Sequence, residues 1–263
     1  MCFIFMYIHI EISKSFRYNL LLGDVVMKYL FVDSRISMEE ESNLILLGYN
    51  IIKCPLFSLL YYAISGHPDI LIHVLDEKNL ILHKDIDKRF IKKLENLNFN
   101  IHLSENSLST KYPNNIGLNA VNLSNVFIHN LKYTDPVLIE NVKEKNLINI
   151  KQGYTKCSVA IVNNNAIITS DKVIANKAKE ASIDVLLIPP GDIILPGLDY
   201  GFIGGCCGLL ENNLMAFFGD LNYFAYGNDV KNFLNKHDVK TVYLRDGKLI
   251  DRGSILSNHI IFT

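Results

Sequence analysis

The stretch that decides the fold is residues 201–220, which read GFIGGCCGLLENNLMAFFGD. Two apolar runs stand on either side of the polar residues 211–213, and Asn-rich turns of this kind connect antiparallel strands. A helix-like segment, NDVKNFLNKHD (228–238), and a strand-like run, KTVYLRDG (240–247), come next. The stretch and its continuation therefore predict a strand–strand–helix–strand unit.

The same order of elements recurs along the chain. We expect helices at 38–48, 85–98, 135–146 and 171–182, the third begun by Asp135 as cap and Pro136 at its first position. Strands are expected at 28–36 and 49–55, and hairpins in DILIHVL (69–75) with NLILHKD (79–85) and in CSVAIVNNNAIITS (157–170). About five such units predict an array or propeller, with the first and last units sharing strands to close a ring. A parallel Rossmann-type sheet is the competing fold, but these strands come as hairpin pairs.

Composition narrows the function classes. The 263 residues are 49% hydrophobic and carry a formal net charge of -1. A near-neutral chain has no bulk attraction to nucleic acid or to an anionic membrane, so we expect neither as a partner. The five cysteines form no Cys-x-x-Cys pair, which favours reduced thiols and a cytoplasmic location. The many Asn, Ile, Lys and Tyr residues suggest a bacterial, AT-rich genome.

Residues 1–26 are expected to be a non-native extension of a single domain at 27–263. They lack a basic leading region and a small-residue cleavage site, and Glu11, Lys14 and Arg17 interrupt their apolar run. Leu22-Gly23-Asp24 can be encoded by codons that contain a ribosome-binding sequence. Both Met1 and Met27 remain possible starts, and we favour Met27.

A ring of five ββαβ units resembles the pentein fold of the guanidino-group-modifying enzyme superfamily. Arginine and agmatine deiminases, dimethylarginine dimethylaminohydrolases and amidinotransferases belong to it. The resemblance covers residues 27 to about 250, and within the superfamily the chain looks most like an uncharacterised clostridial-type branch. It implies a five-bladed α/β propeller around a central channel that holds a small-molecule ligand.

In the resembling enzymes a cysteine after a glycine-rich run attacks the guanidinium carbon. GGCCG (204–208) stands at the matching place, so the resemblance implies Cys206 or Cys207 as nucleophile. The two would point to opposite sides of a strand, and we lean to Cys207. Gly204 and Gly205 would shape the pocket by letting the backbone approach a planar substrate.

Two segments depart from the superfamily pattern. The Gly-His-x-Asp segment of the fourth unit corresponds to QGYTKCSVAI (152–161), which places Tyr154 at the histidine position and Lys156 near the acidic one. A tyrosine with a pKa near ~10 is a poor base at neutral pH. The acidic segment of the third unit corresponds to NAVN (119–122), where Asn119 and Asn122 supply no ion pair to a guanidinium. We keep these four as candidate substrate-binding residues.

GHPD (66–69) offers a replacement for the missing base. His67 would serve as general acid or base and Asp69 as substrate anchor, or the segment is a turn fixed by Pro68. Cys157 is expected to be a small buried apolar residue. The sequence contains no HExxH, P-loop or GxGxxG pattern, so we expect no metal and no cofactor.

These residues leave two functions open. The first is a cysteine-dependent hydrolase or transferase that acts on a small amidine- or amide-containing molecule. The alternative is a catalytically inactive pentein that binds a small ligand or a partner protein. Sequence patterns leave open whether the chain is an enzyme, which of the two cysteines faces the channel, the substrate and the oligomeric state.

Overall fold

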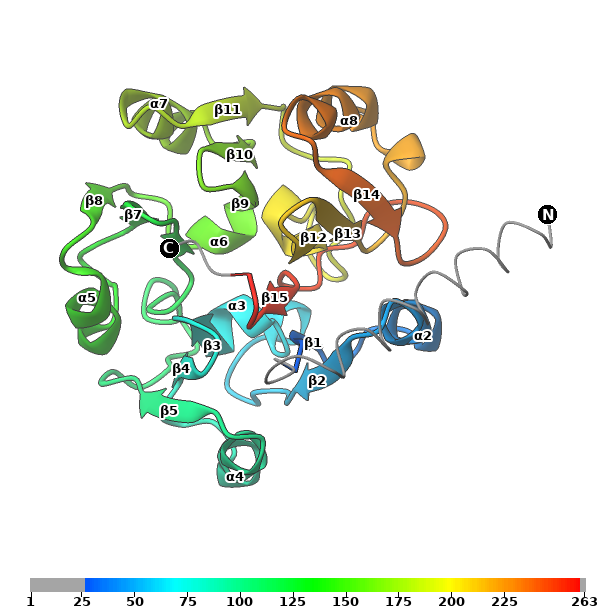
Figure 1. Ribbon diagram of the computed structural model, residues 1–263. Coiled ribbons are helices and arrows are strands. Elements are labelled where there is room, and N and C mark those ends of the chain that lie inside the picture. The colour runs from blue at the N-terminus through cyan, green and yellow to red at the C-terminus, as the bar shows by residue number, and fades with distance from the viewer. Residues whose placement is uncertain (1–26, 261–263) are drawn as a thin grey trace, which may run out of the picture.

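The computed structural model describes residues 27–260, and the expected extension at 1–26 lies outside them. The described chain forms five three-stranded sheets arranged around a common centre (Figure 1). From inner to outer strand, the sheets are β15 (Leu256–Ser257), β1 (Tyr29–Asp33) and β2 (Asn50–Cys54); β3 (Ile72–Val74), β4 (Asn79–Leu82) and β5 (Asn100–Leu103); β6 (Val121–Asn122), β7 (Val126–His129) and β8 (Asn146–Asn149); β9 (Val159–Asn163), β10 (Ala166–Thr169) and β11 (Asp184–Leu187); and β12 (Cys207–Glu211), β13 (Leu214–Phe217) and β14 (Lys240–Tyr243).

Every sheet follows one pairing rule. The inner strand is antiparallel to the middle strand, and the middle strand is parallel to the outer one. A short turn is enough for an antiparallel pair, whereas a parallel pair needs a crossover, which a helix supplies here. The predicted strand–strand–helix–strand unit is therefore confirmed.

The two ends of the described chain share one sheet. Strand β15 pairs antiparallel with β1, and Leu30 lies opposite Ser257 and Phe31 opposite Leu256. The predicted sharing of strands between the first and last units is confirmed. Since the first sheet takes strands from both ends, its formation depends on contacts across nearly the whole sequence.

In the described part of the chain, four of the five crossover helices begin at a side-chain cap, and the last, α8 (Gly227–Lys236), has none. Ser37 and Glu40 form a capping box, and Asp87, Asp135 and Asp171 each accept a bond from a first-turn amide. The helices are α2 (Met38–Leu46), α4 (Lys88–Asn96), α5 (Pro136–Val142), α7 (Lys172–Glu180) and α8 (Gly227–Lys236). Within residues 27–260 no helix has the length and apolarity needed to cross a membrane.

Single helical turns precede three of the inner strands. They are α3 (Pro68–Leu71), α6 (Thr155–Ser158) and the 3-10 turn η2 (Ile203–Cys206); further 3-10 turns lie at η1 (Tyr62–Ile64) and η3 (Leu221–Tyr223). The expected strands at 69–75 and 157–163 are thus wrong in their first residues. Pro68 fixes a helical φ at the first position of α3, and four residues are too few to show a helical period in the sequence.

Candidate functional site

A cavity of about 100 Å³ lies where the five sheets meet. Each sheet contributes residues of its inner strand to the wall, and most of these residues are apolar. The polar lining residues are Asp69, His73, Asn122, Lys156, Cys207 and Ser257. The cavity thus brings together four candidates from the sequence, Asp69, Asn122, Lys156 and Cys207, which makes it a candidate small-molecule site.

A buried polar cluster stands beside the cavity. We call Asp69, Asn119, Lys156, Cys157 and Ser254 the hub. Cys157 Sγ donates to Asp69 Oδ2 at 2.8 Å, and the Ser254 hydroxyl lies 2.7 Å from the same oxygen. Lys156 Nζ donates to Ser254 Oγ at 3.1 Å. Asn119 Oδ1 accepts the backbone N–H groups of Lys156 and Cys157 and thereby holds the first turn of α6.

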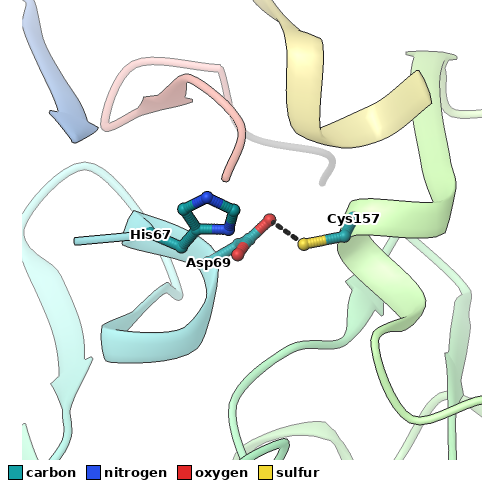
Figure 2. A group of neighbouring side chains, drawn as sticks. All are labelled: His67, Asp69 and Cys157. Carbon is teal, nitrogen blue, oxygen red and sulfur yellow. Dashed lines mark hydrogen bonds between the residues drawn. The ribbon is translucent and has the colours of Figure 1, made fainter. Parts of the chain in front are cut away.

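His67 lies at the edge of the hub, where it caps α3 without a side-chain hydrogen bond. The ring is buried, and its Nδ1 atom is 4.0 Å from Asp251 Oδ1. A Cβ atom on Gly253 would lie 2.3 Å from the His67 side chain, so the backbone at Gly253 packs closely against His67. Figure 2 shows His67 at the start of α3 and Asp69 within it, with Cys157 of α6 pointing toward them.

Burial sets the protonation of these groups. It raises the pKa of Asp69 to about 6, against the opposing charge of Lys156 and the bond from Cys157. Burial also raises the pKa of the Cys157 thiol well above its ordinary value, and the nearby Asp69 carboxylate adds to the increase. The pKa of His67 is lowered by burial, against the charge of Asp251. The ring is therefore mostly neutral at pH 7.

Gly204 and Gly205 of the GGCCG segment pack closely against other residues of the protein. A Cβ on Gly204 would lie 2.2 Å from the Val159 carbonyl oxygen, and one on Gly205 would lie 2.0 Å from Asp251 Oδ1. These distances are far below van der Waals contact, so both positions need glycine for close packing. The two glycines let protein segments approach one another and do not line the described cavity.

The adjacent cysteines differ in their surroundings. Both are buried, and both thiols donate to the carbonyl oxygen of Ile203, at 3.1 Å from Cys206 and 3.2 Å from Cys207. Cys207 begins β12 and lines the cavity, whereas Cys206 ends η2 and packs in the core. Burial raises the pKa of Cys206 well above its ordinary value. No hydrogen bond joins His67 to either thiol in the described part of the chain.

The remaining candidates have separate places. Tyr154 caps α6, its ring centroid lies 5.8 Å from that of Tyr112, and burial raises its pKa above the ordinary value. Tyr154 therefore stays a neutral phenol at pH 7. Asn122 accepts a bond from Lys145 Nζ at 2.7 Å and lines the cavity. Asn119 is fully buried and acts on the backbone of α6.

The sequence did not single out Cys157 or Ser254 of the hub, or Asp251 beside His67. A regular spacing of glycines in the sequence indicates the place of Cys157. Gly66, Gly153 and Gly201 each stand six positions before the first residue of an inner strand, at Ile72, Val159 and Cys207 respectively. Three positions after these glycines come Asp69, Lys156 and Gly204, and all three contact Ser254 in the structure. Cys157 follows directly in this alignment.

His73 is a further cavity residue that the sequence did not single out. Its Nδ1 atom lies 3.1 Å from the Leu118 carbonyl oxygen, which makes Nδ1 the protonated nitrogen. Asn122 Nδ2 lies 3.4 Å from Nε2. Burial lowers the pKa of His73 to about 4, so the ring presents a neutral acceptor nitrogen at pH 7.

The solved structures similar to this chain include dimethylarginine dimethylaminohydrolases and an amidinotransferase. A variant of the DDAH from Pseudomonas aeruginosa in complex with citrulline has a TM-score of 0.50 at 8% identity, over 82% of this chain and 91% of that one. A dimethylarginine dimethylaminohydrolase adduct with S-methyl-L-thiocitrulline has a TM-score of 0.50 at 10% identity, over 82% and 92%. An amidinotransferase of the saxitoxin biosynthetic pathway from Microseira wollei has a TM-score of 0.51 at 9% identity, over 78% and 72%.

At these identities the likeness shows the fold, and the predicted pentein architecture is confirmed. No curated protein sequence matches the chain. One family model does match it, and the match extends from the middle of β1 to the start of β15. With residues 31–256 covered, the chain belongs to the family described as "Family of unknown function (DUF6873)".

Proposed function

We propose that the chain is a cysteine-dependent hydrolase or transferase that acts on a small molecule with an amidine or amide group. The observation that carries the proposal is the shared cavity, which is lined by the Cys207 thiol, the Asp69 carboxylate and the Lys156 ammonium group. A nucleophile and two charged groups at one otherwise apolar site are typical of a reaction centre. The similar enzymes add support because they share the fold.

The proposed reaction has two steps at Cys207. The sulfur forms a bond to the carbon of the amidine or amide, the carbon–nitrogen bond breaks, and the thiol proton leaves with the departing amine. Water then attacks the same carbon and restores the thiol, or a second amine does so in a transferase. Asp69 accepts N–H groups of the substrate, and Lys156 donates to a carbonyl oxygen.

We propose a smaller part for His67 than the general acid or base expected from the sequence. It does not line the cavity, and its nearest charged neighbour is Asp251. We propose His73 instead, a ring of the cavity wall whose Nε2 is an acceptor nitrogen 3.4 Å from Asn122 Nδ2. We therefore propose that a residue of the cavity wall accepts the proton of the Cys207 thiol, and His73 is the candidate.

A matched pair of electrophiles tests this proposal. 2-Chloroacetamidine and 2-chloroacetamide differ only in the group that the cavity is proposed to bind, and both alkylate a thiol with loss of chloride. We expect site-specific mass spectrometry of the folded chain to find the label on Cys207. The label should be lost in Cys207→Ser and kept in Cys206→Ser, and the faster probe identifies the preferred group. Labelling no faster than that of glutathione would overturn the proposal.

The burial of both thiols favours one second candidate, a pentein that binds a ligand without reaction. Cys206 is 0% exposed and Cys207 is 1% exposed, and each is bonded to Ile203. A binding protein needs no reactive thiol. This second candidate predicts that neither probe labels the chain. Small amides or amidines should still raise the melting temperature of the chain, and Lys156→Ala should reduce that increase.

A further inference from the structure

Three polar atoms beside the cavity have no hydrogen-bond partner. Both ring nitrogens of His67 and the Oδ1 atom of Asp69 are buried and unpaired within the described residues. His67 and Asp69 are each 1% exposed, so bulk water does not satisfy them. Buried polar atoms in proteins are nearly always paired, and an ordered water or a bound ion is the usual partner where protein groups supply none.

A third donor points at the same space. Cys157 Sγ, a ring nitrogen of His67 and a carboxylate oxygen of Asp69 all lie within 4.8 Å of one another. Bond lengths of ~2.0–2.3 Å in a tetrahedral zinc site place ligand atoms roughly 3.3–3.8 Å apart, so side-chain shifts of about 1 Å suffice. From this geometry we propose that His67, Asp69 and Cys157 bind one zinc ion (Figure 2).

Neighbouring groups orient two of the three ligands. His67 Nδ1 lies 4.0 Å from Asp251 Oδ1, so this carboxylate stands beside the ring outside hydrogen-bond distance. The Ser254 hydroxyl holds Asp69 Oδ2 at 2.7 Å and leaves Oδ1 free. Asn119 Nδ2 lies 3.5 Å from Cys157 Sγ and can donate to a thiolate.

The donor set selects zinc among the common ions. One thiolate, one imidazole and one carboxylate are ligands that zinc accepts together, whereas Mg²⁺ and Ca²⁺ prefer oxygen donors alone. The charges also agree, because the thiolate of Cys157 and the carboxylate of Asp69 together neutralise a divalent ion. Binding exchanges the thiol proton for the metal and releases that proton to solvent.

A zinc ion here would join distant parts of the chain. His67 and Asp69 belong to the turn before β3, and Cys157 belongs to the turn before β9. The sequence led us to expect no metal because these donors, at 67, 69 and 157, form no local motif. Three protein ligands leave a fourth position for water or a bound molecule. The site shares Asp69 with the proposed substrate pocket, but zinc binding is measured without any reaction at Cys207.

Metal binding by the full chain tests the inference. Metal-free protein, prepared by dialysis against a chelator, is titrated with zinc in competition with a chromophoric chelator and, separately, with Co²⁺. We expect one ion per chain, a higher melting temperature with zinc, and a thiolate-to-cobalt charge-transfer band in the near ultraviolet. No zinc binding by the folded chain, or a cobalt spectrum without that band, would overturn the inference.

Substitutions locate the ion. Cys157→Ser keeps a hydroxyl that can donate to Asp69. It should weaken zinc binding more than ~100-fold, because replacing a residue that only hydrogen-bonds to a metal ligand already lowers metal affinity ~10–100-fold. Cys206→Ser is the matched control, because that thiol is equally buried and belongs to no ligand cluster in the described residues. If Cys157→Ser fails to fold, His67→Gln supplies the second test. Unchanged zinc affinity in a folded variant of either ligand contradicts the site.

Discussion

His129 shows how burial of a single residue makes the stability of the whole chain depend on pH. Its Nδ1 atom is 2.7 Å from Thr134 Oγ1, and its Nε2 atom is 3.1 Å from the Gly153 carbonyl oxygen. Burial lowers the pKa of this ring to about 3, although the bond to Gly153 acts in the opposite direction. The folded chain therefore keeps the ring neutral, while the unfolded chain protonates it near its ordinary value of ~6.5.

The sign of the effect follows from proton uptake. Below pH 6.5 the unfolded state binds more protons at His129, so the stability that the neutral ring contributes falls as the pH falls toward the folded pKa of about 3. Between pH 7 and pH 5 we expect a loss of about 2 kcal/mol from this ring, at ~1.4 kcal/mol per pH unit. Urea unfolding at both pH values should show a loss smaller by that amount in His129→Gln than in the unchanged chain. Equal losses in both proteins would assign the pH dependence to other groups.

At the scale of elements, the turn before β12 depends on glycine at two successive positions. Gly204→Ala would drive a Cβ atom into the backbone of β9, and Gly205→Ala would drive one into Asp251. We expect each to lower the free energy of unfolding by at least about 1–3 kcal/mol, the usual cost of overpacking. Gly117→Ala is the matched control, because its Cβ would meet nothing nearer than 3.6 Å. Urea midpoints for the three variants measure the difference, and a Gly204→Ala value equal to that of the control would contradict this packing.

The crossover helices could be predicted, and the turns that build the site could not. Caps such as Asp135 and Asp171 mark helix starts locally, and nine or so residues show a helical period. The turn α3 has four residues and no visible period, so the direction of its side chains is set by tertiary contacts. For that reason the sequence could single out Asp69, yet it could not pair this carboxylate with Cys157, which lies 88 positions away in the sequence.

At the scale of the whole molecule, the repeat carries most of the predictable information. Five similar units favour a ring, because a ring gives each unit two neighbours, and the shared sheet of β15 and β1 is the structural result. The inner strands lie at the centre of this ring, and single turns precede three of them. Residues that occupy equivalent positions in the repeat, such as Asp69 and Lys156, are thereby brought together at the hub.

Closure of this ring depends on Asn258, which is buried directly after β15. Its Oδ1 atom accepts the Tyr29 N–H at 2.8 Å, and its Nδ2 atom donates to the carbonyl oxygens of Met27 at 3.3 Å and Glu77 at 3.1 Å. Asn258→Ala removes these three hydrogen bonds, so we expect a loss of about 1–3 kcal/mol in the free energy of unfolding.

The local consequence distinguishes ring opening from a general loss of stability. In Asn258→Ala the Tyr29 amide should exchange its hydrogen faster than amides of the fourth sheet, β9 to β11, because the first sheet loses its link between the two ends of the chain. Asn141→Ala removes an exposed side-chain bond to Val137 and serves as control, with an expected change below ~0.5 kcal/mol. Uniformly faster exchange in all five sheets would show that the ring unfolds as one unit. It would also show that the loss of Asn258 does not open the first sheet separately.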